Sequence, residues 1–157
     1  MSRPIPTYTV ADLEYLTELD FDSFTNDDAV DLGLTAVEVI SEWDLNLAVD
    51  IVLAGDLVFR AKLGNTGPDN DPWLRMKAAT AMRFGEPSLL VRRRHEEAGT
   101  PFEERDDVDH DSFKAHGGSV PIKVGGEIVG TITVSGEPDA VDHEVSAETI
   151  RRYLAAR

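Results

Sequence analysis

Two β-hairpin patterns separated by a helical stretch place the strongest constraint on the fold of this chain. The first combines a nearly continuous apolar run from Leu45 to Ala54 with alternation over residues 57–63, and the second joins residues 119–124 to residues 127–135. Glycine lies at both turns, and short β-branched runs joined by glycine turns fold as antiparallel pairs. The order hairpin, helices, hairpin, helix therefore predicts a single α+β domain with an antiparallel sheet.

Helical periodicity accounts for most of the remaining chain. Thr9 is an expected helix cap, a second helix is expected to start at Thr25 or Asn26, and Asp71 is expected to cap a helix whose first residue is Pro72. We expect helices over residues 9–19, 25–43, 72–84, 88–97 and from 140 or 146 to 154, with one or two helical turns over 109–115. The alternation in the first hairpin predicts one face made of Leu57, Phe59, Ala61 and Leu63.

Length and composition exclude several classes of protein. A chain of 157 residues with 41% hydrophobic residues can bury the core of one domain. We find no apolar run near the roughly 18 residues that span a bilayer and no apolar leader at the N-terminus, so we expect a cytoplasmic protein. The absence of cysteine excludes disulfides, thiolate nucleophiles and thiolate metal ligands.

The formal net charge of −15 is unevenly distributed. Residues 1–59 hold thirteen acidic residues and one basic residue, whereas residues 60–94 hold eight basic and three acidic residues. Because phosphate backbones require a basic footprint, nucleic acid is not an expected partner. The basic stretch predicts either a pocket for an anionic ligand or a solvated face that balances acidic neighbours.

The first glycine-rich segment runs from Gly64 to Trp73 and leads into a helix. It lacks the Gly-Lys-Ser/Thr ending of a phosphate-binding loop and the spacing of an EF-hand. A helix N-terminus here could hold an anion, or the acidic and amide residues could only satisfy turns and caps. Arg75 and Lys77 are two positions apart and diverge around the helix, so we expect at most one of them to line a pocket.

The second glycine-rich segment, residues 115–122, contains the histidine with the strongest case for a functional role. His116 precedes Gly117-Gly118 at a turn that enters a strand, where the backbone aims its side chain. No His-x-x-His or His-x-x-x-His pair exists, so no preformed zinc site is expected. His116 is then either a ligand contact or a structural residue. A triad of Ser135, His116 and an acid is a weaker alternative, because Ser135 lies outside a Gly-x-Ser-x-Gly motif.

These segments together resemble a known family. The first motif that carries the resemblance is Thr66-Gly67-Pro68-Asp69-Asn70-Asp71-Pro72-Trp73, followed by Arg75, Lys77, Arg83-Phe84-Gly85 and Ser88. The second is His116-Gly117-Gly118-Ser119-Val120-Pro121-Ile122, followed by residues 129–136 and Asp142-His143. They are similar to the uncharacterised protein family UPF0303, which is grouped with haem-degrading-domain proteins similar to HbpS and GlcG. The resemblance covers about residues 28–156.

The resemblance implies a profilin-like fold, with an antiparallel sheet flanked by helices, in a symmetric homo-oligomer. It also implies that residues 1–24 are an N-terminal extension with a short helix, and that residues 25–157 form the haem-degrading-like domain. Haem is the cofactor that the family name suggests. Nothing in the residues selects haem independently, because the sequence shows no large apolar slot.

Three functional hypotheses follow. The leading one is a domain that binds a small molecule or cofactor, acts as an oligomer, and forms its pocket where the two glycine-rich segments converge. Its candidate ligand-binding residues are His116, Arg75, Lys77, Asn70, Trp73, Gly117 and Ser135. The alternatives are a non-enzymatic protein-interaction module with an acidic surface and an enzyme that uses His116. We assign no catalytic residue, no metal ligand and no membrane partner.

Overall fold

A computed structural model describes residues 3–157, and its centre is a four-stranded antiparallel sheet. The strands are β1 (Ala48–Leu53), β2 (Asp56–Lys62), β3 (Ser119–Val124) and β4 (Glu127–Ser135), and they are arranged in the order β2-β1-β4-β3. Each predicted hairpin forms, and the central contact between β1 and β4 joins the two hairpins into one sheet. The predicted α+β class with an antiparallel sheet is therefore confirmed.

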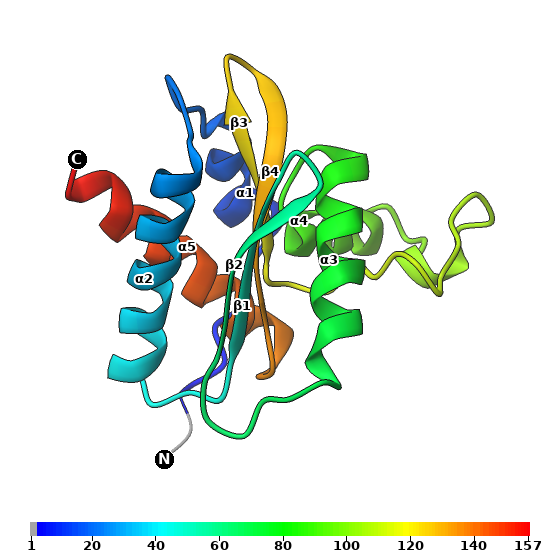
Figure 1. The fold of residues 1–157 in the computed structure, drawn as a ribbon. Coiled ribbons are helices and arrows are strands. Elements are labelled where there is room, and N and C mark those ends of the chain that lie inside the picture. Colours follow the sequence, from blue (N-terminus) through cyan, green and yellow to red (C-terminus); the bar gives the residue numbers. More distant parts are fainter. Residues whose placement is uncertain (1–2) are drawn as a thin grey trace.

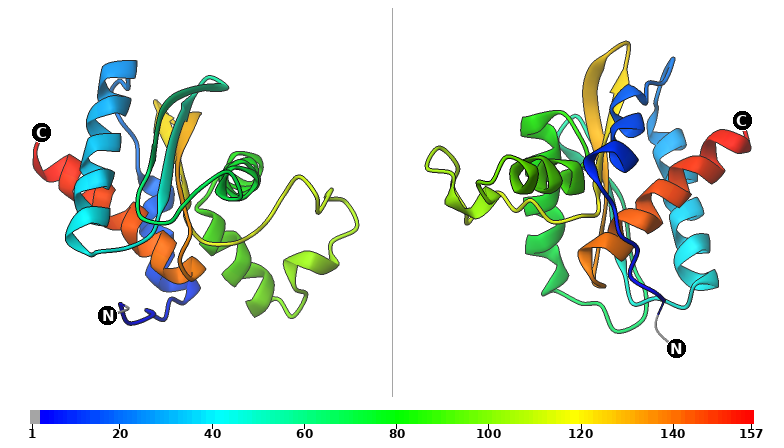
Figure 2. Two further views of the ribbon diagram at one scale, coloured as in Figure 1. Left: turned by 60° about the horizontal axis from the view of Figure 1, so that its bottom comes forward. Right: turned by 180° about the vertical axis from the view of Figure 1, so that it is seen from behind.

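Helices cover both faces of the sheet (Figure 1). The helices α2 (Asn26–Glu42) and α5 (Asp139–Ala155) pack on one face, and α3 (Asn70–Phe84) packs on the other. In Figure 2 the chain after α4 (Ser88–Glu97) forms a long loop that projects away from the sheet before it returns to β3. None of the helices within residues 3–157 is long and apolar enough to cross a membrane.

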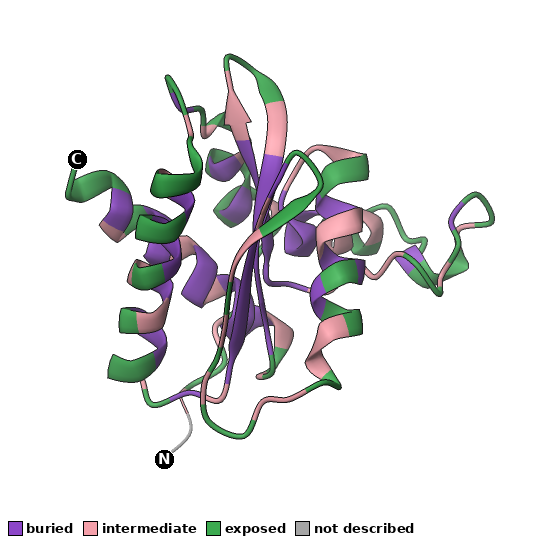
Figure 3. Cartoon of the chain, in the orientation of Figure 1, coloured by how far each residue is buried: buried purple, intermediate pink, exposed green. Residues whose placement is uncertain are grey.

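The two faces of the sheet differ in chemistry. The face under α2 and α5 carries the apolar residues Val49, Ile51, Val120, Ile122, Ile132 and Val134, which form most of the strand contribution to the main core. The residues that alternate with them, Asp50, Ser119, Thr131, Thr133 and Ser135, are also buried. They lie on the face covered by α3, because successive strand residues point to opposite faces. Figure 3 shows this buried layer along the central part of the sheet, whereas the edge strand β2 is exposed or intermediate.

The short N-terminal helix packs onto the rest of the molecule. The helix α1 (Val10–Leu13) continues as a 3₁₀ turn over Glu14–Glu18, and Leu13 contacts Leu89 and Leu90 of α4. The predicted cap at Thr9 is confirmed, since its hydroxyl accepts a hydrogen bond from the Asp12 backbone N–H at 3.3 Å. Thr25 caps α2 in the same reciprocal arrangement with Asp28.

Two predictions about the first hairpin and the following helix are wrong. Ile51 pairs with Phe59 and Val52 pairs with Leu57, so Val58 is an extra residue that shifts the alternation. Leu57 therefore lies on the α3 side, whereas Phe59, Ala61 and Leu63 pack against the core. The helix α3 begins at Asn70 rather than Pro72, and the Asp71 carboxylate does not cap it.

The remaining boundaries agree with the periodicity. The helix α4 has the predicted range, and α5 begins at Asp139, one residue before the earlier of its two predicted starts. A single hydrogen-bonded turn at residues 110–112 takes the place of the predicted helical turns over 109–115, and a short 3₁₀ turn forms at Phe102–Glu104.

Candidate functional site

The two glycine-rich segments converge and form a cleft, which we call the His116 cleft. Its volume is about 450 Å³, and it lies between the start of α3, the end of β4 and the start of α5. The residues that line it are Asp69, Asn70, Trp73, Lys77, His116, Ser135, Gly136, Glu137, Asp139 and Asp142. Five of the seven candidate residues, His116, Lys77, Asn70, Trp73 and Ser135, therefore lie together within one chain.

The imidazole of His116 packs against the indole of Trp73. Their ring centroids are 5.1 Å apart in an edge-to-face arrangement. His116 is half-buried, and burial together with the nearby Arg92 guanidinium lowers the pKa of its imidazole. The ring is therefore neutral at pH 7, and no hydrogen bond to another part of residues 3–157 occupies it. A neutral imidazole can accept or donate one hydrogen bond to a ligand.

A buried ion pair forms the floor of the cleft. Lys77 Nζ lies 2.8 Å from Asp142 Oδ2 and donates a second hydrogen bond to the Val134 carbonyl at 3.1 Å. Only 3% of the Lys77 side chain and 1% of the Asp142 side chain is exposed. Burial raises the pKa of Asp142 to about 6, although the Lys77 ammonium and two backbone N–H donors oppose that rise.

The glycines beside His116 permit close backbone contacts. A side chain at Gly117 would collide with the Asp139 carbonyl, and one at Gly118, whose φ is +133°, would collide with the Val134 carbonyl. The Gly117 N–H donates to the Asp139 carboxylate at 3.1 Å. Burial alone would raise the pKa of Asp139, but this bond and the Arg92 guanidinium, 2.6 Å away, hold its pKa below the ordinary value. Gly117 thus connects the segment before β3 to α5, and its backbone N–H already has an acceptor within the protein.

The polar residues Asn70 and Ser135 connect the two sides of the cleft. The Asn70 amide oxygen accepts from the Gly67 N–H at 2.9 Å, and its nitrogen lies 3.4 Å from the Ser135 carbonyl. Within the described chain no hydrogen bond links His116 to Ser135 or to a carboxylate, so a Ser-His-acid relay is not assembled.

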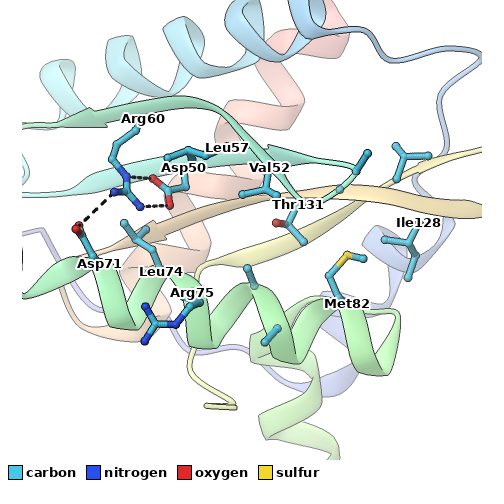
Figure 4. A pocket seen from close by; sticks show the side chains of 16 residues that line it. Asp50, Val52, Leu57, Arg60, Asp71, Leu74, Arg75, Met82, Ile128 and Thr131 are labelled. Atoms are coloured by element: carbon cyan, nitrogen blue, oxygen red, sulfur yellow. Dashed lines mark hydrogen bonds and ion pairs between the residues drawn. The ribbon is translucent and has the colours of Figure 1, made fainter. Parts of the chain in front are cut away.

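Arg75 lies on a different surface from the other candidates. It lines a second, larger hollow of about 850 Å³ between α3 and the sheet, which we call the sheet–α3 groove. Arg75 and Lys77 do diverge as predicted, but the expectation that at most one of them lines a pocket is wrong, since each lines its own. Figure 4 shows Arg75 at the end of the groove opposite Met82 and Ile128.

The sheet–α3 groove is mostly apolar along its length. Its apolar lining consists of Val52, Ala54, Leu57, Leu74, Ala78, Ala79, Met82, Ile128 and Val129. Leu57 and Met82 are each 44% exposed at its rim. The Val58 bulge contributes to this surface, because it turns Leu57 from the core face to the groove face.

A network of ion pairs closes one end of the groove. Asp50 and Arg60 are directly opposite each other on β1 and β2, and two hydrogen bonds of 2.7 and 2.8 Å join them. Asp71 lies 3.5 Å from Arg60 and 2.7 Å from Lys62, and the contact with the Lys62 ammonium lowers the pKa of its carboxyl group. Among residues 3–157, Arg75 is the basic residue of the groove that has no ion-pair partner.

Sequence reasoning missed several residues of both sites. Asp139 and Glu137 enter the His116 cleft from α5 and its preceding turn, and nothing local in the sequence distinguishes them from other acids. Asp142 also lines the cleft, and its only signal was its place in the motif shared with the family. Asp50 did carry a signal, because it interrupts an otherwise apolar strand. A charged residue at such a position is expected to find a partner of opposite charge.

Comparisons with known proteins identify the family. The family described as haem degrading protein HbpS-like matches residues 24–151. A UPF0303 protein of Streptomyces coelicolor is 43% identical over 156 residues, which cover 98% of this chain and 99% of that protein. The crystal structure of the Ybr137w protein has a TM-score of 0.82 and 28% identity, and the match covers 98% of this chain and 91% of that chain.

The fold is also similar to that of a protein crystallised with haem. The crystal structure of the PduOC–haem complex has a TM-score of 0.70 at 18% identity, and the match covers 82% of this chain and 94% of that chain. At this identity the similarity concerns the fold alone. From the family match and the identity to the Streptomyces protein, this chain is a member of the UPF0303 family with an HbpS-like haem-degrading domain.

Proposed function

We propose that this protein binds an apolar small molecule that carries a carboxylate, and that the ligand occupies the sheet–α3 groove. The main observation in support is that a mostly apolar hollow of about 850 Å³ has an arginine without an ion-pair partner within residues 3–157, Arg75, at its charged end. Such a volume is within the usual range of small-molecule sites, which combine apolar walls with a few polar groups that orient the ligand.

Haem is the ligand to test first. The family description names haem, and a protein of similar fold has been crystallised with it. The groove fits the group chemically: its walls suit the porphyrin, Arg75 suits a propionate, and the Met82 thioether is a haem-iron ligand type. Bound haem would supply iron-centred redox chemistry, while the residues of this chain would bind and orient it.

The His116 cleft is the poorer host for haem. Its volume is about half that of the groove, and two of the four carboxylates that line it, those of Asp69 and Glu137, have no ion-pair partner within residues 3–157 and would repel the propionates. We therefore do not include His116 among the residues proposed to bind haem. A role for His116 in an enzyme and the protein-interaction hypothesis both stay predictions.

Haem titration of the purified protein, followed by the Soret band, tests the proposal. Ala78→Phe places a phenyl ring in the groove and should weaken haem binding by roughly tenfold or more, because the ring and the porphyrin would compete for the same space. Arg75→Ala should weaken binding by about fivefold, the upper range for an exposed ion pair. Met82→Leu should shift the Soret maximum while the affinity for iron-free protoporphyrin stays unchanged.

Matched controls make the result specific. Arg83→Ala removes a basic residue from the same helix outside the groove, and Ala155→Phe adds a ring at an exposed position of α5. Both should bind haem like the natural protein. If His116→Ala abolishes the Soret change and Ala78→Phe does not, haem binds elsewhere and the groove proposal fails.

A further inference from the structure

We propose that the His116 cleft is a second site, separate from the sheet–α3 groove, that binds a small organic ammonium ion. The ligand class is a primary or quaternary alkylammonium, and a hydroxyl or carbonyl group on its chain would add a contact to Lys77. The proposal rests on the charges, the aromatic rings and the buried lysine that converge in this cleft. It does not depend on haem or on the use of the groove.

The cleft carries excess negative charge. Four carboxylates line it, from Asp69, Glu137, Asp139 and Asp142. Arg92 neutralises Asp139, and Lys77 neutralises Asp142. Asp69 and Glu137 have no ion-pair partner within residues 3–157, although Glu137 accepts a hydrogen bond from the Asn46 backbone N–H at 2.9 Å. Two negative charges therefore remain available to a cation, and the net charge of −15 adds an attractive field.

The aromatic residues of the cleft add a second kind of cation contact. Trp73 is 38% exposed and lines the cleft, and His116 packs edge-to-face against it. Since His116 is neutral, it adds no positive charge that would repel a cation. An indole beside carboxylates is the arrangement that attracts ammonium groups through the electron-rich face of the ring.

Three backbone donors beside the cleft that could favour an anion are already occupied. The Gly117 N–H donates to Asp139, and the N–H groups of Gly136 and Glu137 donate to Asp142. A metal ion is not favoured either, because no three His, Asp or Glu side chains gather as a metal site in the described part of the chain. An organic cation makes fewer demands on ligand geometry and uses both the carboxylates and the ring.

The buried side chain of Lys77 favours a ligand with a hydrogen-bond acceptor near its ammonium group. Lys77 uses two of its three N–H donors, on Asp142 and on the Val134 carbonyl. Its third donor has no partner within residues 3–157, and the side chain lines the floor of the cleft. A ligand hydroxyl or carbonyl would satisfy it. The Asp142 carboxylate offsets the repulsion between the Lys77 ammonium and a bound cation.

Isothermal calorimetry with choline chloride and butylammonium chloride tests the proposal, with sodium chloride holding the ionic strength constant. Both cations should bind with a dissociation constant of roughly millimolar, as expected for ligands of this size. Sodium butyrate at the same concentration should not bind. Binding of butyrate without binding of either ammonium ion would overturn the proposal.

Substitutions in the cleft should separate the two kinds of contact. Trp73→Leu should weaken choline binding by roughly three- to thirtyfold, and Trp73→Phe should retain part of it. Asp69→Asn and Glu137→Gln should each weaken butylammonium binding by about two- to fivefold, and both replacements keep an oxygen that can accept a hydrogen bond. Circular dichroism confirms that each variant is folded.

The control is Asp106→Asn, which removes one exposed negative charge outside the cleft. It should leave both affinities unchanged. If Asp106→Asn weakens binding as much as Asp69→Asn, the cations bind to the acidic surface in general and the site does not exist. Unchanged affinity in Trp73→Leu and in both carboxylate variants leads to the same conclusion.

Discussion

At the scale of single residues, His143 shows how burial controls a titration. Its side chain is 1% exposed on α5, its ring packs edge-to-face on Tyr8 at 5.1 Å, and its Nδ1 has no hydrogen-bond partner among the described residues. Burial lowers the pKa of His143 to about 4 from 6.5. Between these values the unfolded chain binds a proton that the folded chain excludes, so folding stability falls as pH falls.

His143→Phe should therefore stabilise the protein in acid. Relative to the natural protein, its free energy of unfolding should rise by up to about 3 kcal/mol between pH 6.5 and pH 4. Asp142, whose pKa is raised to about 6, contributes the opposite slope in both proteins, because its folded form takes up a proton first. Urea unfolding at several pH values measures the difference. A difference that does not change with pH would show that His143 does not titrate in this way.

At the scale of elements, the N-terminal helix is held by apolar contacts rather than by its own length. The four residues of α1 are too few to be stable alone, but Leu13 is fully buried with Leu89 and Leu90. That residues 1–24 form an extension outside the haem-degrading-like domain stays a prediction from the sequence. The packing nevertheless joins this helix to α4, which lies in the region predicted to form the haem-degrading-like domain.

Leu13→Ala should destabilise the whole domain by about 3 kcal/mol, because it leaves a cavity in a closed apolar cluster. The matched control is Leu34→Ala on α2, where the leucine is 56% exposed and the change should stay within about 0.5 kcal/mol. Urea denaturation of both variants measures the free energies. Equal effects for the two variants would mean that α1 does not fold with the domain.

At the scale of the whole molecule, the charge of −15 opposes folding at low ionic strength. The basic residues between 60 and 94 reduce this repulsion locally, through pairs such as Lys62 with Asp71 and Arg94 with Glu86. Exposed pairs of this kind contribute little individually. Repulsion among the unpaired acids therefore determines how the stability responds to salt.

Raising sodium chloride from about 0.02 M to about 0.3 M should increase Tm by roughly 2–5 °C, because the screening length falls to a few ångströms. Differential scanning calorimetry measures this shift. Sodium perchlorate at the same concentrations should give the same increase, since screening depends on ionic strength and not on the anion. A fall in Tm with both salts would show that attractive ion pairs dominate.

Local patterns in the sequence were sufficient for most of the elements. The alternation around Gly125-Gly126 predicts the second hairpin, the Thr9 cap predicts where α1 begins, and the acidic residues after Asn26 predict the start of α2. These features depend on residues within a few positions of each other, so no long-range information is needed. The convergence of the two glycine-rich segments was also predicted, and the contact between His116 and Trp73 lies where they meet.

The separation into two sites depended on the tertiary structure. Asp142 finds Lys77 across 65 positions of sequence, and the Val58 bulge turns Leu57 into the groove, away from the face that alternation predicts. The sequence by itself determined the strands, the helices and the divergence of Arg75 from Lys77, because these follow from local periodicity. Only the packing of α3 and α5 against the sheet decided which charges are paired and which are free to meet a ligand.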